Sequence, residues 1–231
     1  MTPRDAATVR PGLPKKDRVP VRSAMTAAFV NAMQLGVVDY RYKGRLCVKC
    51  PMDLAIYAEL LQDLRPRSII EFGSYEGGSA IWLADQVAAF GLEATVFSFD
   101  IRPLTDVAYP GVEFRFCDTA RIRDSIGDAF MRALPRPLLL IEDASHVYGN
   151  VLATMEFFHE HAEPGDYLIV EDGMISIAEA EDLHGYEGGP FQAIHTFLKE
   201  HPGHYAIDRA RCDRFGPNVT WNPDGYIRRI A

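Results

Sequence analysis

The sequence has no long apolar run and no excess of basic residues. No stretch approaches the ~18 apolar residues that a membrane span requires. The polar, proline-punctuated N-terminus lacks the apolar segment of a signal peptide, so we expect a cytoplasmic protein. The formal net charge of −8 argues against nucleic-acid binding, because proteins that bind phosphate backbones normally carry a basic patch. A small-molecule partner is therefore expected, rather than a membrane or a nucleic acid.

Cysteine is also scarce, with four residues in a chain of 231, which suits free thiols in a reducing compartment. Cys47 and Cys50 form a C-x-x-C pair, a spacing found in redox motifs and in zinc sites. A structural zinc site needs a second ligand pair at suitable spacing, and none stands out here. We interpret this pair as two ordinary thiols near a turn.

The remaining composition is that of a globular protein, with 48% hydrophobic and 24% charged residues. The length favours a single α/β domain. Residues 1–22 carry four prolines among many charges and are predicted to form a flexible or extended arm. Residues 23–231 are predicted to form the domain. Its first two helices are predicted over 24–35 and 53–64, and we expect them to cover the active site. Asp53 is the predicted N-terminal cap of the second helix.

Strands and helices then alternate along the chain. Strands are predicted over 68–72, 95–100, 112–116, 138–142, 167–170, 205–208 and 226–230. Helices are predicted over 78–90, 122–133, 147–161 and 189–200. The strands read as continuous apolar runs, which indicates burial on both faces. Their alternation with helices predicts a doubly wound, Rossmann-like α/β fold with a mostly parallel sheet.

A glycine-rich turn, IIEFGSYEGGSA, joins the first long strand to the following helix over residues 69–80. Backbone N–H groups at such a turn can approach a ligand closely. A dinucleotide-binding turn would require G-x-G-x-x-G, but Tyr75 occupies the position of the second glycine. The carboxylate of Glu76 would also repel the negatively charged diphosphate. S-adenosylmethionine (SAM), with its sulfonium and ammonium groups, fits better, and Glu71 can hold that positive portion. A glycine-rich connection without a ligand is the alternative.

Two further acids close the next two strands. Asp100 ends TVFSFD, where an acid accepts hydrogen bonds from ribose hydroxyls in nucleoside-binding sheets. Asp118, in FRFCDTA, is placed to reach the adenine side. Each acid alone is a common feature of strand ends, but their order after the glycine turn indicates a SAM site.

Three carboxylates follow the last two parallel strands. Asp143 follows one strand, and Glu171 and Asp172 end the next. The carboxyl ends of parallel strands meet in one crevice, where three carboxylates repel one another unless a cation intervenes. Hard oxygen ligands favour Mg²⁺ over zinc. The alternative is that each acid caps the segment after it, but a metal explains the three together.

His146 stands three residues after Asp143 and would lie beside the metal-bound oxygen of a substrate. Its unperturbed pKa of about 6.5 suits a general base near neutral pH. The alternative is a water-exposed histidine at a helix start. We expect the other histidines at the surface.

The motifs E-x-G-x-x-x-G-G-S-A, D-x-x-H and G-D-Y-L-I-V-E-D occur in an order that resembles the cephalosporin hydroxylase-like methyltransferases. The segments over 188–198 and 215–230 are similar to that family's ending, so the resemblance runs from about residue 53 to the C-terminus. The metal motif is also similar to that of the macrocin-type sugar O-methyltransferases.

This resemblance implies a class I methyltransferase fold with a seven-stranded doubly wound sheet, and commonly a homo-oligomer. Carried over by residue, it makes His146 the base and Asp143, Glu171 and Asp172 the Mg²⁺ ligands. It also implies that Gly73, Tyr75, Gly78, Ser79, Asp100 and Asp118 contact SAM. We add Glu71, Ser74 and Asp143 to these as candidate cofactor-binding residues.

The combined prediction is a SAM-dependent, Mg²⁺-assisted O-methyltransferase. Its substrate would be a small hydroxylated molecule, such as a vicinal-diol sugar or a catechol-like group in an antibiotic or other natural-product intermediate. The alternatives are a SAM-binding partner subunit of an oxygenase, a nicotinamide-dependent oxidoreductase and a metal-dependent hydrolase. Met174, Tyr186, Phe191 and Trp221 are candidate pocket residues, although apolar side chains are more often core.

Overall fold

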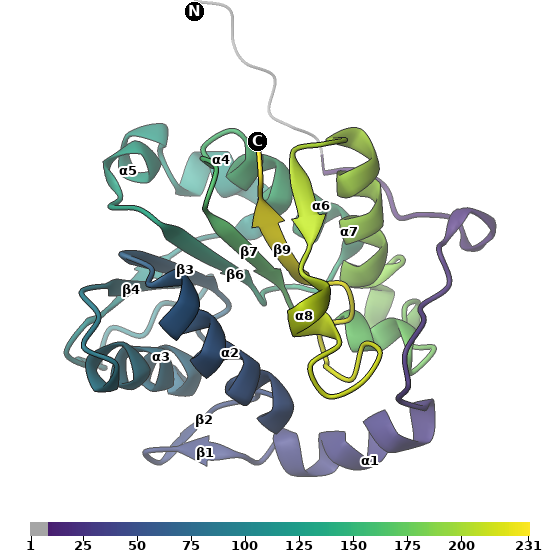
Figure 1. Cartoon of the computed structure of the whole chain (residues 1–231), viewed down its shortest axis with the longest axis horizontal. Coiled ribbons are helices and arrows are strands. Elements are labelled where there is room, and N and C mark those ends of the chain that lie inside the picture. The colour runs from purple at the N-terminus through teal and green to yellow at the C-terminus, as the bar shows by residue number, and fades with distance from the viewer. Residues whose placement is uncertain (1–8) are drawn as a thin grey trace, which may run out of the picture.

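The computed structural model describes residues 9–231. The first eight residues of the predicted arm lie outside the described residues. One seven-stranded sheet runs through the chain in the order β5-β4-β3-β6-β7-β9-β8 (Figure 1). Its strands are β3 (Ser68–Phe72), β4 (Thr95–Asp100), β5 (Val112–Phe116), β6 (Leu138–Glu142), β7 (Tyr167–Val170), β8 (Tyr205–Ile207) and β9 (Tyr226–Arg229).

The first five of these strands pair in parallel, and β9 is antiparallel to both of its neighbours. The chain winds outward from β3 through β4 to β5 and then returns to β6 on the other side of β3. This reversal makes a switch point, beside which open α/β sheets bind their ligands. The predicted doubly wound α/β fold with seven strands is confirmed.

Helices cover both faces of the sheet because adjacent strand residues point to opposite sides. Ile69 packs in the core under α2 (Pro51–Leu64) and α3 (Gly78–Ala89). Ile70 packs in the core under α6 (Tyr148–His159) and α7 (Gly189–Glu200). Burial on both faces explains why the strands read as continuous apolar runs.

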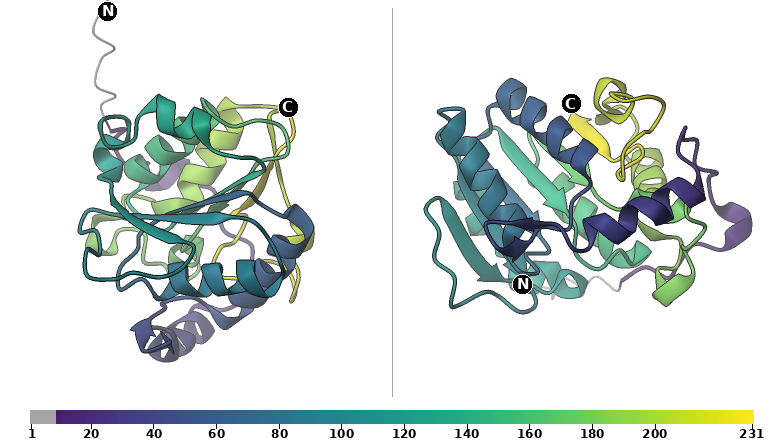
Figure 2. Two further views of the ribbon diagram at one scale, coloured as in Figure 1. Left: turned by 90° about the vertical axis from the view of Figure 1, so that its left-hand side faces the viewer. Right: turned by 90° about the horizontal axis from the view of Figure 1, so that it is seen from below.

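The remaining elements are short or lie outside these two layers. They are α1 (Ala27–Val37), α4 (Ile122–Ser125), α5 (Asp128–Ala133), α8 (Arg209–Cys212), β1 (Arg41–Tyr42), β2 (Arg45–Leu46), and the 3-10 turns η1 (Lys15–Asp17), η2 (Thr119–Arg121), η3 (Gly173–Ser176) and η4 (Leu183–Gly185). In the view from below, α1 and the β1–β2 hairpin cross in front of the sheet (Figure 2, right). The hairpin packs tightly on α3, where a Cβ on Gly78 would lie 2.2 Å from the carbonyl oxygen of Leu46.

Two helix predictions were wrong in detail. Helix α2 begins at Pro51, and Asp53 lies inside it rather than capping it. The Asp53 carboxylate instead accepts hydrogen bonds from Thr220, from the backbone N–H of Trp221 and from the Tyr226 hydroxyl. The single helix predicted over 122–133 is two short helices, because the chain leaves helical geometry at Ile126 and Gly127.

The described part of the arm is extended and held against the domain. The backbone N–H of Leu13 donates to the carbonyl oxygen of Glu187 at 3.0 Å. Val19 exchanges two hydrogen bonds of 2.8 Å with the amide side chain of Gln192 on α7. Within residues 9–231, no helix has the length and apolar character needed to cross a bilayer.

Candidate active site

The acidic residues predicted from the sequence emerge at one edge of the sheet. Asp143 follows β6 directly, and Glu171 and Asp172 follow β7. These strands are parallel neighbours, with Glu142 in register with Val170. Since both strands end at this register, the next residues leave the sheet side by side.

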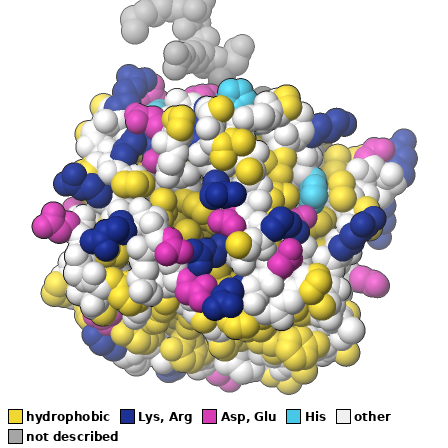
Figure 3. All heavy atoms as spheres, in the orientation of Figure 1, with side chains coloured by type: hydrophobic (Ala, Val, Ile, Leu, Met, Phe, Trp, Pro, Cys, Tyr) yellow, Lys and Arg dark blue, Asp and Glu magenta, His cyan; other side chains and the backbone are white. Residues whose placement is uncertain are grey.

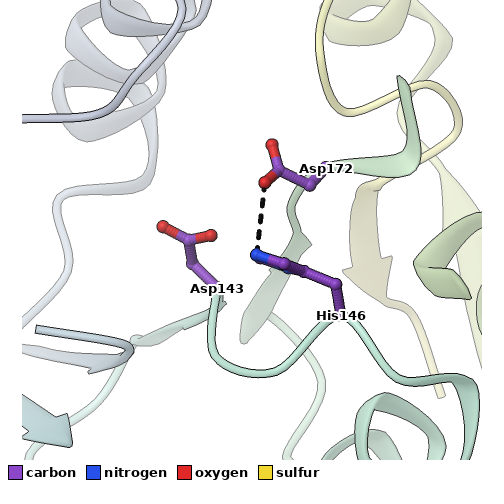
Figure 4. Close-up of side chains that lie close together, drawn as sticks. All are labelled: Asp143, His146 and Asp172. Carbon is purple, nitrogen blue, oxygen red and sulfur yellow. Dashed lines mark ion pairs between the residues drawn. The ribbon is translucent and has the colours of Figure 1, made fainter. Parts of the chain in front are cut away.

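Asp143, His146 and Asp172 converge there, with one ligand atom from each lying within 4.8 Å of the other two. Figure 4 shows the three side chains pointing toward one another, with the His146 ring directed towards the Asp172 carboxylate. The His146 Nε2 lies 3.4 Å from the Asp172 Oδ2. Both His146 (φ 54°) and Asp172 (φ 58°) have left-handed backbone, which is uncommon outside glycine and often found at functional sites.

The capping alternative fails for the two aspartates in this group. Helix α6 begins after Val147 and has no side-chain cap. The Ser145 hydroxyl accepts from the Asn150 amide instead, at 2.9 Å. Asp172 precedes η3 but makes no capping hydrogen bond to it. Neither carboxylate is therefore explained by capping the segment that follows it.

The observed group differs from the predicted ligand set, because His146 belongs to it and Glu171 does not. The Glu171 Oε1 lies 2.5 Å from the Lys49 Nζ and accepts a 2.6 Å hydrogen bond from the Tyr57 hydroxyl. The same ammonium lies 2.5 Å from the Asp143 Oδ2. Lys49 is only 3% exposed, so this is a buried ion triad.

Sequence reasoning missed Lys49. It lies between the two cysteines of the C-x-x-C pair, belongs to no motif of its own, and is far from the acids along the chain. All four cysteines are free, as predicted, and the structure buries all of them. Burial raises the pKa of Cys47 and of Cys50 to about 12. The feature of this segment that reaches the site is the lysine, not the thiols.

Burial and charge act against one another at this cluster. Burial, followed by the nearby Asp143 charge, raises the pKa of Glu171 well above its usual value. Burial also raises the pKa of Asp143, although Lys49 opposes this. Burial alone would lower the pKa of His146, but the Asp172 and Asp143 carboxylates outweigh it and raise that pKa. An additional cation would relieve this repulsion.

A hard divalent cation fits the donors that are present. The Asp143 and Asp172 carboxylates are oxygen ligands of the kind that Mg²⁺ prefers. No cysteine belongs to the converging group found in residues 9–231, which disfavours zinc or a softer metal.

The glycine-rich turn lies beside the acids because β3 adjoins β6. Gly73 has φ +100°, and a Cβ on it would lie 1.9 Å from the carbonyl oxygen of Asp143. The backbone N–H of Tyr75 donates to Asp100 at 3.0 Å, which fixes the turn to the end of β4. Glu71 is fully buried and accepts from the Ser98 hydroxyl at 2.6 Å. Its second oxygen, Oε1, has no hydrogen-bond partner in the described chain.

A pocket of about 340 Å³ opens along this edge. It is lined by Gly73, Phe99, Asp100, Ile101, Cys117, Asp118, Thr119, Ala144, Ser145 and Asn150. Three of the predicted SAM contacts, Gly73, Asp100 and Asp118, are therefore brought together. Asp118 also caps η2, accepting from the backbone N–H of Ala120 at 3.0 Å.

The other predicted contacts lie outside the pocket lining. Tyr75 is 63% exposed, and the group through which it contacts the site is its backbone N–H, which donates to Asp100. Ser74 is buried and shares a 2.7 Å hydrogen bond with Ser98. Gly78 and Ser79 are buried in the first turn of α3. Sequence reasoning did not single out Phe99, Ile101 or Asn150, because apolar strand ends and helix amides carry no distinctive signal.

The family described as "Rhamnosyl O-methyltransferase/CmcI" matches this chain over residues 36–230. This chain belongs to that family. The rhamnosyl O-methyltransferase of Mycobacterium leprae (strain TN) is 32% identical over 192 residues, which is 81% of this chain and 82% of the relative. The protein of the same name from Mycobacterium tuberculosis (strain ATCC 25618 / H37Rv) is 31% identical over 193 residues, with coverages of 81% and 77%.

Solved structures of CmcI share the fold. The apo structure of CmcI-N160 superposes with a TM-score of 0.64 at 25% identity and covers 84% of this chain and 77% of that one. The structure described as "cmcI-D160 Mg-SAM" gives a TM-score of 0.61 at 26% identity, with coverages of 84% and 78%. The predicted family, the class I fold and the assignment as an O-methyltransferase enzyme are confirmed.

Proposed function

We propose that this O-methyltransferase uses SAM and Mg²⁺ to methylate a hydroxyl group of a sugar that bears a neighbouring oxygen. The observation that carries the proposal is the convergence of Asp143, His146 and Asp172 beside the pocket that Asp100 and Asp118 line. Relatives named rhamnosyl O-methyltransferase favour a deoxysugar acceptor over a catechol. A natural-product glycoside is the substrate class we propose.

For the methyl donor, Asp100 and Asp118 are the proposed contacts with ribose and adenine. Both carboxylates are already oriented by backbone N–H groups, of Tyr75 and of Ala120. The free Glu71 oxygen supplies negative charge behind the turn, on the side of the donor's positive groups. A solved relative described with Mg and SAM supports this pairing of cofactors.

For the metal, Asp143 and Asp172 are the proposed ligands, whereas Glu171 is paired with Lys49. When bound, SAM supplies the methyl group, and Mg²⁺ polarises the acceptor hydroxyl. Because Mg²⁺ prefers oxygen, we assign His146 as the base rather than as a ligand. Its Nε2 faces Asp172 at 3.4 Å, so the proton that it accepts from the hydroxyl is stabilised by that carboxylate.

The proposal is tested by measuring S-adenosylhomocysteine release from SAM with rhamnose-bearing glycosides and with catechols, with and without EDTA. We expect turnover on the glycosides that EDTA abolishes and Mg²⁺ restores. Asp143→Asn should abolish turnover, and Asp85→Asn is the matched control, because its partners lie in the β1–β2 hairpin and at Tyr109. Turnover unaffected by EDTA would exclude the metal, and turnover on catechols alone would exclude the sugar.

We also propose a homo-oligomer. Helix α1 and the residues just after it expose Phe29 (47%), Leu35 (76%) and Val38 (42%). In the space-filling view, hydrophobic side chains gather along the lower edge, where α1 lies (Figure 3). An apolar face of this kind is typical of an association surface. Light scattering coupled to size exclusion would test it, and a Leu35→Glu variant is expected to reduce the mass to that of the monomer.

A further inference from the structure

Lys49 is a buried cation for which the proposed chemistry has no use. It lies in the loop between β2 and α2, two residues before the helix begins. Its backbone N–H donates to the carbonyl oxygen of Cys47 at 2.8 Å, and its side chain is buried. The ammonium then reaches two acids that end neighbouring strands, Asp143 and Glu171, each at 2.5 Å.

Negative charge is concentrated at this point. The carboxyl groups gathered there belong to Glu71, Glu142, Asp143, Glu171 and Asp172. Two cation-forming side chains touch this group: Lys49 contacts Asp143 and Glu171, and His146 contacts Asp172. Lys49 therefore supplies, from within the chain, the kind of charge that a metal ion supplies from solution.

We propose that Lys49 is an internal counter-cation that competes with the divalent metal ion for the Asp143 carboxylate. It holds the acids together in the metal-free protein and yields Asp143 when the metal arrives. This inference rests on the proposed metal site, and it assigns to Lys49 a control of metal affinity rather than a part in methyl transfer.

The contacts on the far side of the ammonium explain how it can yield. Glu171 is held in place by the Tyr57 hydroxyl at 2.6 Å, so it remains a partner for Lys49 after Asp143 turns away. Two cations on the same carboxylate repel each other strongly in a buried site. Removing the lysine charge should therefore tighten metal binding, whereas a purely structural tie would leave affinity unchanged. A role in aiming Asp143 at the metal would make affinity weaker on removal.

The test compares metal binding by the wild-type protein with Lys49→Met and with Lys49→Gln, which keeps an N–H donor and carries less risk to folding. Lys43→Met is the matched control, because Lys43 forms an ion pair with Asp85 but is 50% exposed. Mn²⁺ binding is followed by electron paramagnetic resonance and Mg²⁺ binding by calorimetry. Thermal unfolding is recorded in EDTA and in Mg²⁺.

We expect both Lys49 variants to bind Mn²⁺ at least about tenfold more tightly than wild type. Their melting temperature should fall in EDTA and recover with Mg²⁺ by a larger increment than in wild type, and Lys43→Met should match wild type. Equal or weaker binding in the Lys49 variants would overturn the inference while leaving the metal site intact. Absence of Mn²⁺ and Mg²⁺ binding by the wild-type protein would overturn both the metal role and this inference.

Discussion

Asp53 links the helix next to the active-site lysine with the C-terminal loop, and its removal should destabilise the protein strongly. The side chain is 1% exposed and lies in the first turn of α2. Its carboxylate accepts hydrogen bonds from Thr220, from the backbone N–H of Trp221 at 2.9 Å and from the Tyr226 hydroxyl at 2.8 Å. These donors lie in the loop before β9 and at the first residue of β9, between 167 and 173 residues away in sequence.

The expected magnitude follows from what Asp53→Ala would leave behind. Each buried donor that loses its acceptor costs about 1–3 kcal/mol. Two of the three donors are hydroxyls that can turn towards one another, so we expect about 3–5 kcal/mol in total rather than the full sum. Asp53→Asn keeps the volume and one acceptor, so about half of that loss is expected.

The assay is equilibrium unfolding in urea, with Asp63→Ala as the matched control. Asp63 lies on the same helix, but its side chain is 72% exposed and it pairs with Arg211 at the surface. Such a pair contributes about 0–1 kcal/mol. If Asp53→Ala cost no more than Asp63→Ala, the three buried hydrogen bonds would not be a source of stability. An Asn variant as damaging as the Ala variant would equally contradict the reasoning.

Three further predictions concern the site and the response to pH. His146→Gln should lower kcat by about 10²–10⁴-fold without changing the binding of SAM measured by calorimetry; His201→Gln is the control, and equal rates in both variants would exclude the base. Gly73→Ala should lose both stability and SAM binding, since its Cβ would meet the Asp143 carbonyl at 1.9 Å, whereas Gly91→Ala, with φ +62° and open space, carries only the backbone strain. Burial, with the neighbouring charges of His201 and Arg229, lowers the pKa of His159 to about 4. Because an unfolded histidine titrates near pH 6.5, the stability from neutral His159 is present above about pH 6.5 and is lost as the pH falls towards 4. Thermal unfolding of wild type and His159→Gln across this range should show a steeper fall in wild type, and parallel curves would exclude it.

The centre of the sheet could be predicted from the sequence because strands β3, β4, β6 and β7 are buried along most or all of their length and are mainly apolar. A run such as Leu138–Glu142 is apolar at every position but the last, and it lies between two helical layers. The errors arose where a distant residue decides the local structure. Asp53 has the residue type and position of a helix cap, but its partners in the C-terminal loop draw it inward and the helix begins earlier, at Pro51. The two-residue strands of the β1–β2 hairpin are too short to give a periodic signal.

The position of the candidate site could be predicted from the sequence, but the partners of each acid could not. Parallel strands carry their carboxyl ends to one edge, so acids after β6 and β7 had to meet. Which of them face the same point depends on backbone angles that the sequence does not display. Asp172 turns into a left-handed conformation (φ 58°), and its side chain departs from that of Glu171 just before it. The partner of Glu171 is Lys49, which lies 94 residues from Asp143 and 122 residues from Glu171 in the sequence. The two carboxylates of this adjacent Glu-Asp pair therefore have different partners, since Asp172 faces His146 and Glu171 faces Lys49. A sequence motif that contains both acids cannot show this difference, because it does not include the distant lysine.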